Sequence, residues 1–234
     1  PQQMFGAVAK SYFAKKLGYN VLLAPQAEVD AFLPPHELNC PALLDPAAPL
    51  ALDPMTPGEL LMRYRENHLA AMQRALEVID EVDAKFADSF GRSYGGVLSE
   101  YRMKDAEVAV VTVGGMTGAG MDAVDEARER GIRAGLVKLR AIRPFPAARL
   151  AKALSGVRAF CCVDRSVSFG WNCGPMYVET RAALAGAADR ASFSAIGGLG
   201  GADISVADFA SAIDRLESVK NAPGVYDTLW FMKD

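Results

Sequence analysis

The chain has 234 residues, of which 51% are hydrophobic and 23% are charged, a balance typical of a globular protein with a filled core. The net charge of −3 gives no electrostatic basis for binding nucleic acid or an anionic membrane surface, and no run approaches the roughly 20 apolar residues of a membrane span. We therefore expect no nucleic-acid or membrane partner.

The first 55 residues show two patterns. Residues 1–24 carry apolar side chains near helical spacing and then a short apolar run, which predicts a short helix followed by a strand. Eight of the thirteen prolines lie between residues 25 and 57, so we expect that stretch to be no helix and a poor strand. We interpret it as an extended arm over a surface, with these apolar anchors: Leu38, Leu43, Leu44, Leu50 and Leu52. Because Pro1 is not a methionine, we expect further residues before it.

A long helix is predicted over residues 57–90. Thr56, Pro57 and Glu59 have the arrangement of a capping box with proline at the first helical position. Apolar residues then recur at gaps of three to five positions from Leu61 to Phe90. Such a helix would be about 50 Å long, more than one small domain needs. It either bridges domains or lies in an interface, or it is broken and both halves pack on one core.

From residue 107 onward, short apolar runs alternate with helical segments. The expected strands cover residues 107–113, 132–139, 157–163 and 192–196. The expected helices cover about 120–130, 146–155 and 174–184, and a last one from the Ser205 cap to about Leu216. This alternation predicts an α/β fold with a doubly wound, mainly parallel sheet. An apolar tail follows, and we expect it to dock on a partner chain: Tyr226, Leu229, Trp230, Phe231 and Met232.

The cysteines and histidines do not form a recognisable catalytic or metal-binding pattern. No CxxC pair is present, and Cys161 and Cys162 would point to opposite faces of a strand. We expect four reduced structural thiols, including Cys40 and Cys173, in a cytoplasmic protein. Neither histidine lies in a motif that would serve a Ser–His or Cys–His mechanism: His36 and His68.

Two loops at the carboxyl ends of expected strands hold weak candidates for a cofactor site. In the loop 114–120, the backbone at Gly115 and the hydroxyl of Thr117 could hold an anion, but glycines for a tight turn explain it better. The spacing does not match G-x-G-x-x-G, and no acidic residue ends the second strand. Arg140 and Arg143 could bind a carboxylate or phosphate, or pair with acids across a subunit contact, which we favour.

Two further loops follow the third and fourth strands. Asp164, Arg165 and Ser166 could form a site, although an Asp–Arg pair that fixes the loop is the commoner use. The glycine-rich turn 197–201 is explained equally well by close approach of another backbone and by a ligand. No residue is assigned as catalytic or as a metal ligand.

Three segments in this order resemble one family. They are Leu136–Pro146 after the glycine loop, Val163–Glu179 with its Asp164-Arg165-Ser166 and Gly174-Pro175, and the turn Gly198–Ile204. The order resembles the α subunit of pyruvate:ferredoxin oxidoreductase and related 2-oxoacid:acceptor oxidoreductases, over about residues 40–205. Ala202 stands where the family's turn has an arginine.

The resemblance implies a transketolase C-terminal-like domain over residues 106–218. Residues 1–55 would be the remnant of an N-terminal domain with the arm, 56–105 the linker helix and its connection, and 219–234 the docking tail. Family members convert a 2-oxoacid such as pyruvate or phenylglyoxylate to an acyl-CoA and CO2, with thiamine diphosphate, Mg²⁺, [4Fe-4S] clusters and coenzyme A. The resemblance places these cofactors on other chains or domains, namely a thiamine-pyrophosphate-binding β, a γ and a cluster-binding δ subunit. This chain would then be scaffold and interface.

Two other readings stay open. One is a nucleotide-binding α/β module of the electron-transfer flavoprotein type, against which the absent fingerprint counts. The other is a non-catalytic partner domain that shares only the fold, which fold alone does not distinguish.

Overall fold

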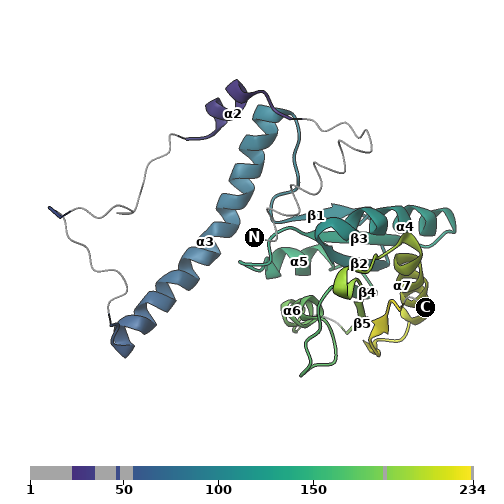
Figure 1. The fold of residues 1–234 in the computed structure, drawn as a ribbon. Coiled ribbons are helices and arrows are strands. Elements are labelled where there is room, and N and C mark those ends of the chain that lie inside the picture. Colours follow the sequence, from purple (N-terminus) through teal and green to yellow (C-terminus); the bar gives the residue numbers. More distant parts are fainter. Residues whose placement is uncertain (1–22, 35–45, 48–54, 187–188, 233–234) are drawn as a thin grey trace. The chain divides into compact units, whose positions relative to one another are not determined.

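The computed structural model describes residues 23–34, 46–47, 55–186 and 189–232 (Figure 1). The chain divides into two compact units, residues 1–56 with 85–92 and residues 57–84 with 93–234. The expected helix and strand of residues 1–24 lie almost wholly outside the described part, as do the five leucine anchors of the arm, His36 and Cys40.

The first unit contains a helix that the sequence analysis did not predict. Helix α2 spans Gln26–Phe32 and begins directly after Pro25. The expectation that the proline-rich stretch contains no helix is therefore wrong here. A proline just before a first turn gives up no helical hydrogen bond, and the next proline, Pro34, lies beyond the helix end. The ring of Phe32 lies 5.7 Å from that of Phe86 and 5.4 Å from that of Phe90.

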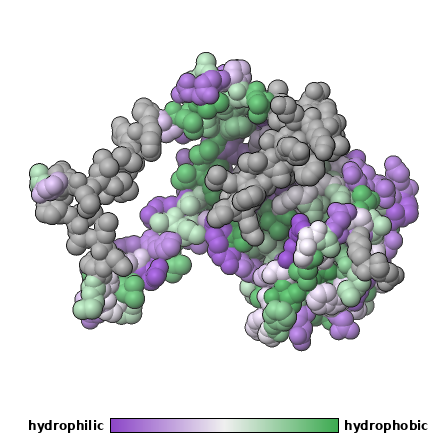
Figure 2. Space-filling view, viewed as in Figure 1, coloured by the Kyte–Doolittle hydropathy of each residue, from purple (hydrophilic) through white to green (hydrophobic). Residues whose placement is uncertain are grey.

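Helix α3 runs unbroken over Gly58–Phe90, 33 residues, which confirms the predicted long helix. None of its side chains is buried. Exposed apolar residues lie along it, among them Leu61, Tyr64 and Leu69, and Figure 2 shows hydrophobic residues on its surface. The helix is therefore not a core element of the described structure.

Within the second unit, the carboxylates of Asp80 and Asp83 connect α3 to the segment before β1 and to Arg149. Asp80 accepts from the amide of Val97 at 3.2 Å and pairs with Arg149. Asp83 accepts a hydrogen bond from the Ser93 hydroxyl and others from the amides of Tyr94 (3.0 Å) and Gly95 (3.2 Å).

The second unit carries a mainly parallel sheet, as predicted, and it has seven strands, of which four were predicted. The strand order is β1-β3-β2-β4-β5-β6, and β7 also pairs with β5. The central strands are β2 (Val108–Val113), β3 (Ala134–Leu139), β4 (Ala159–Asp164) and β5 (Ala191–Ile196), all parallel to their neighbours in this group. Strand β1 (Leu98–Tyr101) is antiparallel to β3 and was not predicted.

Helices cover both faces of the sheet, so the fold is doubly wound (Figure 1). One face packs α4 (Thr117–Glu129) and α7 (Val206–Val219); the other packs α5 (Ala147–Ala153) and α6 (Pro175–Ala183). Short 3-10 turns follow β2 (η1, Gly114–Met116) and β5 (η2, Leu199–Gly201). Helix α4 begins three residues earlier than predicted, and α7 extends three residues further.

Local signals explain several of these elements. Ser205 caps α7, as predicted, and forms a capping box with Asp208, since each side chain bonds the other's backbone amide. Cys161 packs in the α4–α7 core and Cys162 in the α5–α6 core, as expected for neighbours in a strand.

The tail folds onto its own domain. Strands β6 (Gly224–Val225) and β7 (Leu229–Trp230) both pair with β5, and the ring of Phe231 lies 6.4 Å from that of Phe209. The tail therefore has contacts within its own domain, and its docking on a partner stays a prediction. Trp230 and Met232 remain exposed, at 47% and 78%.

Candidate functional site

The loop after β2 is a tight strand-to-helix turn. Gly114 has φ of +75°, a conformation that favours glycine. The hydroxyl of Thr117 donates to the carbonyl of Gly114 at 2.8 Å and lies 3.0 Å from the hydroxyl of Thr112. Thr117 is therefore buried inside the turn, whereas Gly115 is exposed. The contacts of Thr117 support the turn interpretation.

The two arginines after β3 pair with carboxylates of the same chain. Arg143 donates to both oxygens of Glu179 at 2.7 Å, and this pairing raises the pKa of the guanidinium. Arg140 pairs with Asp83 at 3.3 Å and lies over the ring of Tyr94. These acidic partners belong to this chain, which corrects the expectation that the two arginines pair across a subunit contact.

Asp164, at the carboxyl end of β4, holds the first turn of α6. Its carboxylate accepts the amides of Met176 at 3.0 Å and Tyr177 at 3.3 Å. The residue is 4% exposed, and this burial raises its pKa to about 6, although the two amide bonds act in the opposite direction. The expected Asp164–Arg165 pair is wrong, because Arg165 donates to the carbonyl of Gly198 at 3.1 and 3.3 Å.

Gly174 is packed directly against this carboxylate. A Cβ at Gly174 would collide with the side chain of Asp164, and the Gly174 amide donates to the Ser194 hydroxyl at 2.9 Å. Carboxylate, glycine and serine therefore fix where α6 begins relative to β4 and β5.

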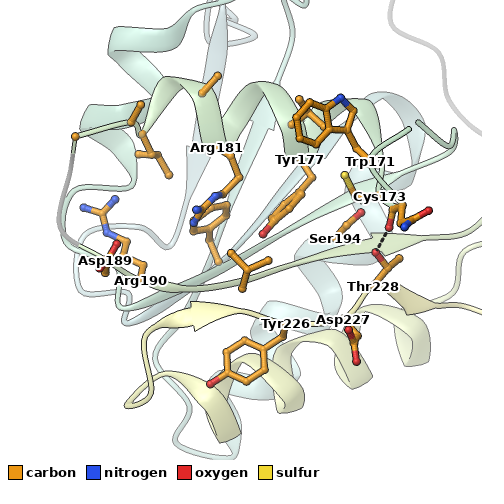
Figure 3. Close-up of a pocket in the computed structure, with 18 residues that line it drawn as sticks. Trp171, Cys173, Tyr177, Arg181, Asp189, Arg190, Ser194, Tyr226, Asp227 and Thr228 are labelled. Carbon is orange, nitrogen blue, oxygen red and sulfur yellow. Dashed lines mark hydrogen bonds between the residues drawn. The ribbon is translucent and has the colours of Figure 1, made fainter. Parts of the chain in front are cut away.

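A cavity of about 690 Å³ lies beside β5, between α6 and the tail (Figure 3). Its polar groups include Arg181, Arg190 and Ser194, and its apolar walls include Phe160 and Tyr177. The hydroxyl of Tyr177 lies 3.0 Å from that of Ser192, which also accepts from Arg181 at 3.3 Å. Sequence reasoning missed this site. The available signal was the alternation of Ser192 and Ser194 with Phe193 in a strand predicted to be buried.

A second cleft, apolar and of about 710 Å³, lies beyond the carboxyl end of β5. It is lined by the glycine-rich turn and by Leu199, Trp230 and Met232. Two of these glycines lie too close to neighbouring side chains for a larger residue. A Cβ at Gly197 would press on Phe231, and a Cβ at Gly198 would press on Arg165.

The described cysteines are buried, unpaired thiols: Cys161, Cys162 and Cys173. Burial raises the pKa of each, so none is a ready thiolate nucleophile. In the described ranges there is no group of three His, Cys, Asp or Glu side chains placed to hold a metal ion. No helix in the same ranges is both long and apolar enough to cross a bilayer.

Comparison with known proteins gives consistent matches. Residues 106–209 match the family model "Pyruvate:ferredoxin oxidoreductase core domain II". The chain is 46% identical to the NADH-dependent phenylglyoxylate dehydrogenase subunit alpha of Aromatoleum evansii, over 86% of the chain and 50% of that protein. It is 33% identical to the pyruvate synthase subunit PorA of Methanosarcina barkeri, over 85% of the chain and 49% of that protein.

The chain thus spans about half the length of the curated relatives it matches. A solved 2-oxoglutarate:ferredoxin oxidoreductase from Magnetococcus marinus superposes with a TM-score of 0.42 and 14% identity, over 59% of this chain and 23% of that chain. The assignment of a family therefore depends on the sequence relatives.

Proposed function

This chain belongs to the family of 2-oxoacid:acceptor oxidoreductase α subunits, and on that premise we propose that it supplies the core domain II portion of such a subunit. The observation that carries the proposal is the 46% identity to a phenylglyoxylate dehydrogenase α subunit over 86% of the chain. The assembled enzyme would oxidise a 2-oxoacid with coenzyme A to an acyl-CoA and CO2, and pass two electrons to NAD⁺ or ferredoxin.

An aromatic 2-oxoacid is the proposed substrate class. Identity to the phenylglyoxylate dehydrogenase subunit is 46%, against 33% and 34% for pyruvate synthase subunits from two methanogens. Pyruvate is the alternative, supported by the larger number of pyruvate synthase relatives.

Within the complex, the chain would serve as scaffold and interface. Its candidate residues already have partners of their own: Thr117 bonds inside its turn, and Arg140 and Arg143 pair with carboxylates. Among the described residues, no three His, Cys, Asp or Glu side chains are grouped so that they could hold Mg²⁺ or an iron–sulfur cluster. As the resemblance to the family implies, we propose that thiamine diphosphate, Mg²⁺, [4Fe-4S] clusters and coenzyme A are bound by other parts of the complex. These would be a thiamine-pyrophosphate-binding β chain, a γ chain and a cluster-binding δ chain.

The test is to purify the complete complex through a tag on the protein that contains this chain. We expect the β, γ and δ chains to co-purify, and phenylglyoxylate to be oxidised with coenzyme A faster than pyruvate when NAD⁺ or an artificial one-electron acceptor is supplied. Faster turnover of pyruvate would contradict the substrate class alone.

The 234-residue chain, produced alone, tests the role within the complex. We expect no 2-oxoacid oxidation even with thiamine diphosphate and Mg²⁺ added, and turnover by this chain alone would contradict the scaffold role. A bound yellow chromophore or retained NAD would instead favour the electron-transfer flavoprotein reading. A colourless monomer that captures no other chain would favour a non-catalytic partner domain.

A further inference from the structure

The cavity beside β5 lies next to a part of the sheet where the buried side chains are serines rather than apolar residues. Helix α6 packs against β4 on this side of the sheet, and beside it β5 presents Ser192 and Ser194. Both serines are at most 1% exposed, whereas Phe193 between them packs into the opposite, α4–α7 core. Buried hydroxyls need hydrogen-bond partners, and these two find theirs in α6 and the turn before it. These hydrogen bonds hold α6 and the turn before it against β5 at the base of the cavity, where Ser194 is a lining residue.

Two guanidinium groups line this cavity. Arg181 donates to the Ser192 hydroxyl at 3.3 Å, and Arg190 to the carbonyl of Ser155 at 3.4 Å. Among the salt bridges of the described residues neither takes part, whereas arginines elsewhere in the domain, such as Arg128, Arg130 and Arg143, pair with carboxylates. Both lining guanidinium groups can therefore accept an anion.

The two acidic residues that line the cavity occupy different places. Asp189 lies beside Arg190, and Asp227 points away from α6, on the far side of the tail strand from Arg181 (Figure 3). Arg181 is thus the cation on the α6 side, next to the hydroxyl of Tyr177. Its planar group suits a carboxylate, which can accept two parallel hydrogen bonds.

The remaining wall is apolar and largely aromatic. The rings of Phe160 and Tyr177 lie 6.2 Å apart along one side, and Trp171, 74% exposed, stands at the opening. Val178, Leu184 and Val225 add to the apolar lining. The volume of about 690 Å³ falls within the range of small-molecule sites, which combine such walls with a few oriented polar groups.

We propose that this cavity binds a small aromatic carboxylate, with the carboxylate on Arg181 and the ring against Tyr177 and Trp171. The proposal does not rest on the assigned reaction, because it concerns only side chains of this domain. Bound ligand would join α6 to β5 and the tail, and so stabilise the domain by an amount that grows with the logarithm of ligand concentration above Kd.

Benzoate is the probe, with benzamide as its neutral counterpart and acetate as the carboxylate without a ring. The chain has two tryptophans, so Trp230→Phe leaves Trp171 as the fluorescent reporter at the cavity opening. We expect saturable quenching by benzoate, at least tenfold weaker binding of benzamide and of acetate, and a rise in Tm with benzoate. Titration calorimetry on the unmodified chain should give the same order of affinities.

Two variants locate the site. Arg181→Met should weaken benzoate binding at least tenfold, and so should Val225→Trp, which places a bulky ring on a lining residue that is 62% exposed. Arg130→Met is the matched control, because Arg130 pairs with Asp214 outside the cavity. No saturable response to benzoate, equal binding of benzamide, or unchanged binding by Val225→Trp would each overturn the proposal. If Arg181→Met does not fold, the Val225→Trp comparison decides.

Discussion

Burial of Asp164 and its hydrogen bonds to the amides of α6 shift the pKa of this carboxylate in opposite directions. Burial raises its pKa from 3.8 to about 6, while the Met176 and Tyr177 amides of α6 favour the charged form. The nearby Glu179 adds to the rise. Since the folded pKa lies above the unfolded one, this carboxylate favours folding below about pH 4, and that contribution is lost as pH rises through 6.

We expect the unfolding free energy to fall between pH 4 and pH 6 by an amount on the order of 3 kcal/mol from this group. Asp164→Asn cannot ionise, so this part of the slope should disappear. Urea unfolding at several pH values measures it. An unchanged slope in the variant would show that Asp164 is not the titrating group.

Gly174 is required by contact rather than by backbone conformation. A Cβ at this position would collide with the Asp164 carboxylate, whereas one at Gly170, in the same loop, would meet nothing within 4 Å. We expect Gly174→Ala to lower the unfolding free energy by roughly 1–3 kcal/mol and Gly170→Ala to leave it nearly unchanged. Chemical denaturation compares the two, and equal effects would contradict the contact.

At the scale of elements, Asp83 connects α3 to the segment before β1. The Ser93 hydroxyl and the amides of Tyr94 and Gly95 lower its pKa from 3.8 to about 2. A depressed acid pKa means that the contact contributes above about pH 4 and is lost as pH falls toward 2. Asp83→Asn should imitate that loss at neutral pH.

Hydrogen exchange measures the effect of Asp83→Asn. The amides of Tyr94 and Gly95 should exchange faster in the variant, because their acceptor is weakened. Glu81→Gln, on an exposed position of the same helix, is the control and should leave both amides protected. Equal protection in both variants would contradict the anchoring role.

Element length decided which parts of the fold could be predicted. The four central strands have six residues each and are flanked by glycine, proline or capping signals, so their pattern is readable. Strand β1 has four residues, and β6 and β7 have two each, too few for any periodicity. Their pairing is set by tertiary contact with β3 and β5, which no local pattern records.

At the candidate site, the sequence could predict a local turn but not contacts between residues far apart in the chain. The turn around Thr117 could be predicted because the glycine spacing is a local property, and the bond from Thr117 to Gly114 supports that interpretation. The partners of Arg165 and Arg143 lie 33 and 36 residues away, so sequence order alone could not choose them. The cavity beside β5 likewise forms only when α6, β5 and the tail come together.

At the scale of the whole molecule, the tail contributes one aromatic ring that packs on the core and one that is exposed. Phe231 packs on the core near Phe209, whereas Trp230 is 47% exposed. We expect Phe231→Ala to destabilise the isolated chain by about 2 kcal/mol and Trp230→Ala by less than about 0.5 kcal/mol. Thermal unfolding of both variants tests this. A larger loss from Trp230→Ala would mean that the tail packs differently.

The short pairings of β6 and β7 also bear on solubility. Strand β5 reads Ala-Ser-Phe-Ser-Ala-Ile, with no charge or proline, and such an edge readily recruits strands from other molecules. The tail pairs with both ends of β5, at Ala191–Ser192 and at Ala195–Ile196. Those few residues thus cover part of the β5 edge against intermolecular strand addition, and we expect their proteolytic removal to promote aggregation.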